Sequence, residues 1–375
     1  MLWRSAGTEH RETHVKLAFY IDFDIGMPTG IGRYGVELIR ALGKAGEAPE
    51  IWMRSSQKPC WEALGLPSAR VRCFASPERL ALRTLPRLWS SSSRLQLVHF
   101  PGNALLPVSR RTLRSTLVHD LGPFRFPELK APADTRAWKA WIESAIDGAD
   151  CILTNSRSTL DDLLETFPSA GAKARLTRLG VDHLLDAGSL DRKPDPAGHI
   201  LAVGIVEPRK NLERLFQAYS ILLGKDSGTP PLLVAGHDGY RGQEIRGIPA
   251  RLGIGSRVSF SGYVPESRLR ELYAKASCLV HPALYEGFGF TIPEGFSWGL
   301  PVAASDRASM KELYSGAAYM FDPDEPESIA EGMASCLSRG VLPSQMEERK
   351  RLFGSLTWKS CAEATLDAFR WVTGS

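Results

Sequence analysis

The chain has 375 residues, of which 43% are hydrophobic and 23% are charged, and its formal net charge is +4. This length is above the usual size of one compact domain, so we expect two hydrophobic cores. The weak positive charge is compatible with phosphate or with an anionic surface, and we expect no nucleic-acid partner. No apolar stretch is long enough to span a membrane.

The six cysteines stand singly, without a Cys-x-x-Cys pair, which favours a reducing compartment. Residues 1–14 lack the apolar core of a signal peptide, and we expect them to be disordered. Together these features predict a soluble, cytoplasmic protein.

Short apolar runs alternate with amphipathic segments of helical length, which is typical of β-α units around a parallel sheet. In the first half, the expected strands are 15–21, 50–53, 97–100, 116–118 and 151–154. The polar segment 186–198 contains two prolines and no apolar periodicity, so we place a domain boundary between residues 190 and 191. The first domain is therefore expected to span residues 15–190.

The second half repeats this rhythm, with strands expected at 199–203, 232–235, 257–260, 278–281, 301–304 and 317–321. These strands define a second expected domain at 191–356. Residues 357–375 are expected to form a closing helix, because apolar residues follow Thr357 at helical spacing and threonine is a suitable N-cap. The predicted fold class is α/β, with two doubly wound parallel sheets.

Two short motifs of the first half invite a functional reading. Gly30, Gly32 and Gly35 match the G-x-G-x-x-G pattern of dinucleotide-binding loops. The first of these glycines comes well after the end of the expected strand, and residues 52–54 offer no carboxylate for a ribose, so a dinucleotide site is not favoured. His119 directly follows the strand 116–118 and precedes a proline-rich loop, although a lone histidine is more often packed or exposed than catalytic.

The segment V-G-I-V-E-P-R-K-N at 203–211 ends a strand in Gly204 and places two cations before an expected helix start at Asn211. Arg209 and Lys210 could clamp a phosphate, since arginine offers a planar fork and lysine a point charge. The alternative is a solvated surface pair, which is the commoner fate of such dipeptides.

The segment 281–301 is the most informative, because a strand ends there in a glycine-bearing loop that leads into a short helix. Gly287 and Gly289 allow main-chain N–H groups to approach an anion such as a diphosphate. Glu286 and Glu294 could accept hydrogen bonds from sugar and ribose hydroxyls. For Glu294 the alternative is a capping box that begins at Thr291.

The pattern H-P-x-x-x-E-G-F-G-F-x-x-x-E around Glu286 and Glu294 resembles the signature of retaining glycosyltransferase family four. The resemblance implies a GT-B fold, in which two Rossmann-like domains enclose the active site in a cleft. It also implies a nucleotide-sugar donor and a glycan or lipid-diphosphate-linked acceptor.

The resemblance further assigns roles to single residues. It implies that Glu286 and His119 lie beside the donor sugar, that Glu294 holds the ribose, and that Lys210 contacts the diphosphate. The family often has an arginine where this chain has Ile205, which leaves Arg209 as the candidate for the second positive charge. The other expected donor-binding residues are Gly32, in a glycine loop, together with Gly204, Gly262, Tyr263, Gly287, Phe288 and Gly289.

The E-P-R-K-N segment resembles bacterial mannosyl- and rhamnosyltransferases of surface polysaccharide assembly, which makes GDP-mannose the first donor to consider. We expect no cofactor and no protein nucleophile. Asp22-Phe23-Asp24 matches the metal-binding D-x-D of the other large glycosyltransferase fold, but its place directly after the first strand is wrong for that fold, so we expect no metal.

Three alternatives stay open at this stage. They are a nicotinamide-dependent oxidoreductase that uses the glycine motif, a sugar-nucleotide 2-epimerase, and a nucleotide-sugar-binding protein without turnover. Two basic clusters in the first half are either solvated surfaces or a peripheral contact with anionic membrane lipids. They consist of Arg83, Arg87 and Arg94 around Trp89, and of Arg110, Arg111 and Arg114.

Overall fold

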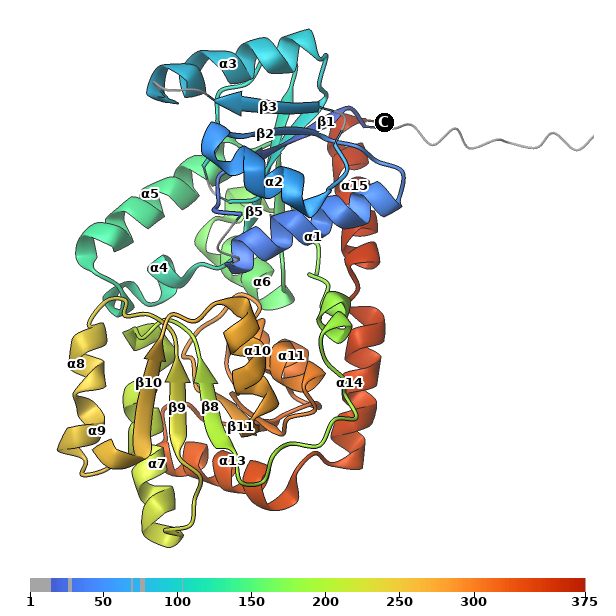
Figure 1. The fold of residues 1–375 in the computed structure, drawn as a ribbon. Helices are drawn as coiled ribbons and strands as arrows, with labels where there is room; N and C mark the ends of the chain where they lie inside the picture. Colours follow the sequence, from blue (N-terminus) through green and yellow to red (C-terminus); the bar gives the residue numbers. More distant parts are fainter. Residues whose placement is uncertain (1–14, 26–28, 69, 75–77, 103, 375) are drawn as a thin grey trace, which may run out of the picture. The chain divides into compact units, whose positions relative to one another are not determined.

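The computed structural model describes residues 15–25, 29–68, 70–74, 78–102 and 104–374 (Figure 1). The segment expected to be disordered, 1–14, lies outside these ranges. The chain alternates strands and helices throughout, as the sequence pattern predicts.

The first sheet has seven strands in the order β3-β2-β1-β4-β5-β6-β7. Its strands are β1 (Leu17–Ile21), β2 (Glu50–Arg54), β3 (Arg70–Phe74), β4 (Leu97–Phe100), β5 (Leu113–Val118), β6 (Cys151–Thr154) and β7 (Ala174–Leu176). The helices between and around them are α1 (Gly30–Lys44), α2 (Lys58–Leu64), α3 (Glu78–Ser92), α4 (Gly122–Arg125), α5 (Pro132–Gly148) and α6 (Arg157–Thr166).

The second sheet has six strands in the order β10-β9-β8-β11-β12-β13. Its strands are β8 (His199–Val203), β9 (Leu232–Ala235), β10 (Val258–Gly262), β11 (Ala276–His281), β12 (Val302–Ser305) and β13 (Tyr319–Phe321). The accompanying helices are α7 (Leu212–Lys225), α8 (Gly242–Arg246), α9 (Ile248–Arg251), α10 (Glu266–Ala274), α11 (Thr291–Ser297), α12 (Ala308–Tyr314), α13 (Pro326–Arg339), α14 (Pro343–Ser355) and α15 (Trp358–Thr373).

Both sheets are wound in two directions from their first strand. In the first sheet β1 pairs in parallel with β2 on one side and with β4 on the other. In the second sheet β8 pairs in parallel with β9 and with β11. Each sheet therefore has a topological switch point, at β1/β4 and at β8/β11, where ligands of such sheets bind beyond the carboxyl ends of the strands.

The strands that the apolar runs predict are confirmed, with ends that differ by up to three residues, whereas β3 and β7 were not expected. β3 has the sequence R-V-R-C-F, whose two arginines give it no apolar run, and it forms the edge of its sheet. β7 has only three residues and forms the opposite edge. Edge strands bury less side-chain surface, so their hydrophobic signal is weak.

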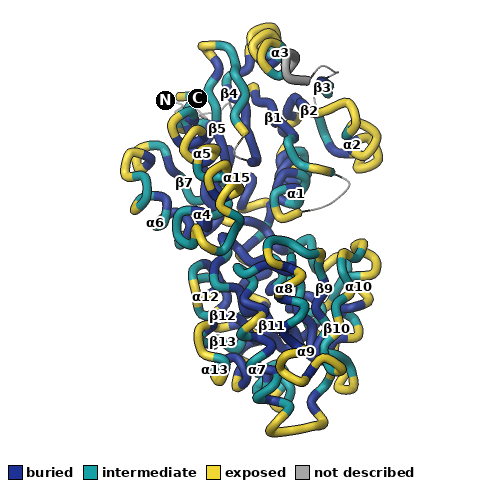
Figure 2. Tube along the Cα trace, turned by 90° about the vertical axis from the view of Figure 1, so that its left-hand side faces the viewer, coloured by how far each residue is buried: buried dark blue, intermediate teal, exposed yellow. Residues whose placement is uncertain are grey.

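Most strand residues are buried, whereas exposed residues gather in the loops and on the outer helices (Figure 2). In the first sheet, Trp52, Phe74 and Phe100 form an aromatic cluster against which Trp89 of α3 packs. In the second sheet, Phe216 of α7 and Met333 of α13 are fully buried in one core with the strands.

The chain divides by its internal contacts into two compact units that differ from the two sheets. The first unit comprises residues 1–116, 149–151 and 362–375, and the second comprises 117–148 and 152–361. Most of α15 thus belongs with the first unit, where Phe369 is fully buried and its ring centroid lies 5.4 Å from that of His99. The N-cap predicted for this helix is confirmed, because the Ser360 N–H donates to Thr357 Oγ1 at 3.1 Å.

The glycine motif of the first half forms a helix, not the expected loop. Thr29 is the N-cap of α1 and its side chain accepts from the Gly32 N–H, so all three glycines lie in the first turns. A side chain at Gly35 would begin only 2.5 Å from the ring of Phe23. The motif therefore makes room for an aromatic ring that follows β1.

Candidate functional site at the ends of β8 and β11

The candidate site lies in the second unit, at the switch point of the six-stranded sheet. After β8 the chain passes through Gly204 into a 3-10 helix at Pro208–Lys210, which carries two cations at its end. After β11 it forms the loop 282–290 before α11 begins. Because β8 and β11 are neighbours, these two loops meet at one edge of the sheet.

Glu286 forms ion pairs with both cations of the 3-10 helix. Its Oε1 lies 2.5 Å from Lys210 Nζ, and its Oε2 lies 2.9 Å from Arg209 Nη1. Burial by itself would raise the pKa of Glu286, but Arg209 and Lys210 outweigh burial and hold the pKa well below its usual value. Glu286 is therefore ionised at any physiological pH.

Arg209 has more partners than Lys210. Its Nε donates to Glu207 at 3.1 Å, and its Nη1 donates to the carbonyl of Tyr285 at 3.0 Å. Burial lowers the pKa of Arg209, but Glu286, Asp120 and Glu207 outweigh this and raise it. A second cation thus stands beside Lys210, on the loop that departs from the family pattern at Ile205.

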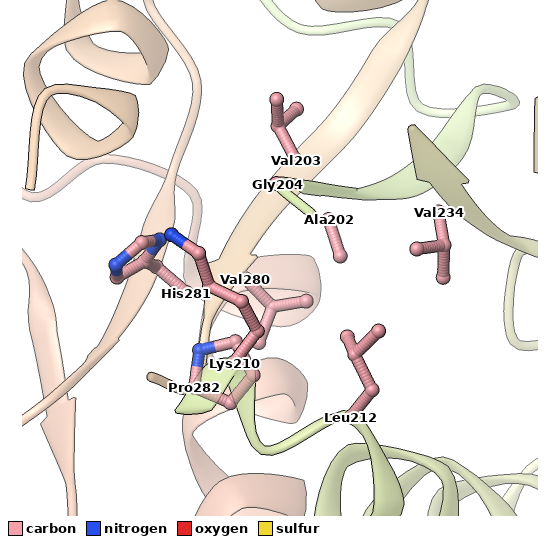
Figure 3. A pocket seen from close by; sticks show the side chains of 9 residues that line it. All are labelled: Ala202, Val203, Gly204, Lys210, Leu212, Val234, Val280, His281 and Pro282. Atoms are coloured by element: carbon pink, nitrogen blue, oxygen red, sulfur yellow. The ribbon is translucent and has the colours of Figure 1, made fainter. Parts of the chain in front are cut away.

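Gly204 allows Lys210 to reach its position. Its φ of +147° is unfavourable for residues with a side chain, and a Cβ there would lie 2.9 Å from Lys210 Cε. The ammonium extends toward the ring of His281, and both side chains line a small pocket of about 10 Å³ (Figure 3). Burial, helped by Lys210, lowers the pKa of His281 to about 3, so this ring stays neutral.

His281 was not among the predicted site residues, although the sequence held a signal for it. It is the last residue of β11, and the carboxyl end of a strand at a switch point is where ligand contacts gather. Its Nε2 is buried, has no hydrogen-bond partner in the described structure, and lies 3.9 Å from Glu286 Oε1.

The loop that follows β11 packs closely on the loop that follows β5. A Cβ at Gly287 would lie 1.7 Å from the carbonyl oxygen of His119, so only glycine fits there. That carbonyl also accepts a hydrogen bond of 3.0 Å from Asn155 Nδ2. The structure therefore brings the main chain of His119 next to the residue that follows Glu286.

The alternative interpretation of Glu294, as part of a capping box that begins at Thr291, is wrong. The N-cap is Phe290 and no side chain caps the helix, so Thr291 already lies within it. The Glu294 carboxylate instead accepts a hydrogen bond of 2.7 Å from the Tyr273 hydroxyl. Glu294 is thus tied to α10.

Comparison with known families decides the class of protein. Residues 191–353 match the family described as glycosyl transferases group 1, and residues 28–183 match the one described as glycosyltransferase family 4. The chain is a glycosyltransferase, and its two halves match these two families. The matches cover the second sheet and all strands of the first sheet except β1, and they include the segments that carry His119, Lys210 and Glu286.

The relatives of this glycosyltransferase include O-antigen enzymes. It is 25% identical over 373 residues to O-antigen chain mannosyltransferase B of Escherichia coli, which covers 91% of this chain and 96% of that relative. It is 23% identical to O-antigen chain mannosyltransferase RfbU of Salmonella typhimurium, over 80% of this chain and 85% of the relative. The name mannosyltransferase is that of these two relatives.

Solved structures confirm the GT-B fold. The sucrose-phosphate synthase of Thermosynechococcus elongatus superposes with a TM-score of 0.71 at 19% identity, over 96% of this chain and 100% of the other. At that identity the likeness concerns the fold alone.

Glu286, Arg209 and Lys210 form an ion cluster. Some of the remaining predicted donor-binding residues lie beside this cluster, and others lie apart from it. Gly262 ends β10, which β9 separates from β8, and Tyr263 is 54% exposed. Phe288 is buried next to the cluster, and its carbonyl accepts from the Tyr314 hydroxyl at 3.0 Å. Gly289, with φ of +77°, precedes α11. Gly32 belongs to α1 in the first unit.

No group of three or more histidine, cysteine or acidic side chains in the described residues has the geometry to hold a metal ion. None of the six cysteines forms a disulfide within the described residues. None of the described helices is long and apolar enough to cross a membrane.

Proposed function

We propose that this glycosyltransferase transfers mannose from GDP-mannose to a glycan or lipid-linked saccharide acceptor, with retention of the anomeric configuration. The observation that carries the proposal is the cluster of Lys210, Arg209 and Glu286 at the switch point of the second sheet. The choice of mannose is supported by the E-P-R-K-N segment and by the printed names of the O-antigen relatives.

The cluster supports different roles for its two cations. Arg209 is bound to Glu207, to Glu286 and to the Tyr285 carbonyl, so it is committed to holding the loop after β11. Lys210 forms an ion pair with Glu286, and its methylenes bend over Gly204 at the end of β8. We assign Lys210 to the donor diphosphate, which offers an ammonium a more highly charged partner than one carboxylate.

The proposed reaction needs no protein nucleophile. The bond between the anomeric carbon and the diphosphate oxygen breaks, and the acceptor oxygen bonds to the same face of that carbon. The acceptor proton passes to the departing phosphate oxygen. Charge grows on that oxygen as the bond breaks, and the Lys210 ammonium and the main-chain N–H groups of the Gly287 loop would stabilise it. Glu286 and His119 would orient the sugar.

The first experiment is a thermal-shift screen with GDP-, UDP-, dTDP- and ADP-sugars, since a ligand that binds the native state raises the apparent Tm. GDP-mannose should give the largest shift. The second experiment incubates the preferred donor with a mannose-containing lipid-linked saccharide and follows the product by NMR. An axial anomeric linkage from α-linked donor supports retention, and an inverted linkage overturns it.

The same assay separates the two rival functions. A 2-epimerase would convert the donor sugar without any acceptor, and the change would be visible in the donor itself. A binding protein without turnover would give a thermal shift but neither transfer nor donor hydrolysis. Consumption of donor that depends on the acceptor distinguishes the transferase from both.

For the location we propose the cytoplasmic face of a membrane, where a lipid-linked acceptor would be available. The supporting observation is that Arg83, Arg87 and Leu88 of α3 are exposed, with Leu88 at 62%. The protein should co-sediment with vesicles of anionic lipids. Replacing both Arg83 and Arg87 with glutamate should abolish this co-sedimentation. Equal sedimentation with neutral vesicles would contradict an electrostatic contact.

A further inference from the structure

Tyr285, which directly precedes Glu286, makes contacts that the proposed roles of the neighbouring residues do not explain. Its side chain is only 4% exposed. Its hydroxyl donates to Asp162 Oδ2 at 2.6 Å and accepts from the Leu121 N–H at 3.2 Å. The phenol thus connects three separate segments, namely the loop after β11, the loop after β5 and helix α6.

Both loops held by Tyr285 carry a residue that we place beside the donor sugar. Glu286 is the next residue along one loop, and Leu121 lies two residues after His119 on the other. The contact between Gly287 and the His119 carbonyl brings the same loops together on the other side of Glu286. Two contacts of different kinds therefore fix the spacing of the loops.

The Tyr285 main chain is held as firmly as its side chain. Its carbonyl accepts from Arg209 Nη1 at 3.0 Å, and Arg209 also pairs with Glu286. Both the main chain and the hydroxyl of Tyr285 are therefore held in place. A shift of the phenol would move Glu286, the next residue, relative to the loop after β5.

Asp162 is a charged anchor for the phenol. The Arg125 Nε donates to its Oδ1 at 2.7 Å, which leaves Oδ2 for Tyr285. Burial raises the pKa of Tyr285, and the nearby carboxylates of Asp120 and Asp162 raise it further. The hydroxyl therefore stays neutral at physiological pH and can donate to Asp162.

We propose that Tyr285 is a positioning residue, whose bridge from Asp162 to the Leu121 N–H sets the distance between Glu286 and His119 around the donor sugar. This inference rests on the proposed function. It concerns the sugar end of the donor and leaves the diphosphate to Lys210. Loss of the hydroxyl should therefore slow transfer without weakening the binding of the free nucleotide.

The test compares Tyr285→Phe with Tyr219→Phe. Tyr219 is equally buried in the same unit, and its hydroxyl donates to the Pro230 carbonyl at 2.8 Å, in the core between α7 and β9. Both variants lose the hydrogen bonds of one buried phenol, and Tyr285→Phe should lose somewhat more stability, because its partner Asp162 is charged. Only Tyr285→Phe should lower kcat, by about 10- to 100-fold, because misplaced reacting groups cost that much.

A double-mutant cycle with Asp162→Ala tests the bridge itself. If Tyr285 acts through Asp162, each single variant should lower kcat and the double variant should be no slower than the slower single one. Calorimetry with GDP should give the wild-type Kd for all variants. Additive losses, or a loss of GDP affinity in folded Tyr285→Phe, would overturn the proposal.

The controls separate this inference from the proposed function. If the wild type transfers no sugar from any donor of the screen, the proposed function fails. If the wild type is active and Tyr285→Phe matches Tyr219→Phe in kcat, the function stands and the positioning role is wrong.

Discussion

At the scale of single residues, the candidate site is an ion cluster that neutralises itself. Glu286 forms ion pairs with two cations. Without them, burying its charged carboxylate would cost considerable folding free energy. Arginine and lysine are not equivalent here, since the planar fork of Arg209 reaches two carboxylates and a carbonyl at once. The lysine is the cation that a diphosphate can recruit with the smaller rearrangement.

Replacing Lys210 with alanine should lower kcat/KM for transfer by on the order of 10²-fold, because one group that stabilises the leaving diphosphate is lost. The Tm should also fall, because the buried Glu286 carboxylate loses one of its two cations and keeps only Arg209. Lys225→Ala, at the exposed far end of α7, is the matched control. Wild-type kinetics in folded Lys210→Ala would show that the diphosphate binds elsewhere.

Glu294→Ala should weaken nucleotide binding, because the proposed ribose contact is removed. Its stability should fall by about 1 kcal/mol through loss of the Tyr273 hydrogen bond. Thr291→Ala provides the control, since Thr291 does not cap α11 and its replacement should leave both properties unchanged. Calorimetry with GDP and thermal unfolding measure the two effects; a capping role would instead destabilise the Thr291 variant.

The buried carboxyl group of Asp22 should make the free energy of unfolding depend on pH. Burial raises its pKa from 3.8 to about 6, so the folded state binds the proton more tightly than the unfolded chain. Stability should therefore fall as the pH rises from about 4 to 6, and the penalty is complete above that range. Asp22→Asn should remove it and gain up to about 3 kcal/mol at pH 7.5, with little gain at pH 3.5.

Denaturant unfolding at several pH values measures this gain. Asp24→Asn changes the other, exposed carboxylate of the same D-x-D match and is the control. A gain that does not depend on pH would mean that the pKa of Asp22 is the same in the folded and the unfolded chain.

At the scale of elements, the strand ends were the predictable part of the site. Apolar runs locate β8 and β11, and the residues directly after them supply Lys210 and Glu286. Glycine patterns were less informative. Gly30, Gly32 and Gly35 resemble a loop in sequence, yet they begin a helix because Thr29 caps it and Phe23 fills the space beside Gly35.

The unpredicted features depend on contacts between residues far apart in the chain. Tyr273 binds Glu294 across 21 positions, and Asp162 binds Tyr285 across 123. A local pattern such as Thr291 to Glu294 fits a capping box equally well, and only the start of α11, with Phe290 as the N-cap, decides against it. Sequence spacing therefore gave the residue types at the site but not their partners.

Gly287→Ala should disrupt the junction between the loops after β5 and β11. The added Cβ would lie 1.7 Å from the His119 carbonyl oxygen, so the main chain must move. We expect a loss of transfer of at least about 10²-fold and a lowered Tm. Gly224→Ala places the same methyl in open space within α7 and should stabilise the protein slightly. Equal activity of both variants would mean that the junction is not needed for catalysis.

At the scale of the whole molecule, the two sheets share one plan, with a switch point beside the first strand of each. This plan was predictable because both halves of the sequence alternate apolar runs with helical segments. The identity of donor base, sugar and acceptor was not, because it depends on side chains from many loops, and the fold does not supply it.

Transfer should survive chelation. Asp22 and Asp24 follow β1 directly, and the described residues offer no cluster suited to a cation. The proposed chemistry stabilises the diphosphate with Lys210 and main-chain N–H groups. Rates should be equal with EDTA and with added manganese. Complete inactivation by EDTA that manganese reverses would refute this mechanism.

The membership of α15 in the first unit has a consequence for synthesis. Phe369 fills the space beside His99, and Cys151 approaches the Ala368 carbonyl, so two later segments complete a core that begins at β1. A nascent chain therefore cannot close its first unit until α15 has left the ribosome, whereas all segments of the second unit emerge earlier. The first unit is therefore synthesised first but completed last. Until α15 packs onto it, the apolar surface that α15 covers is exposed to chaperones.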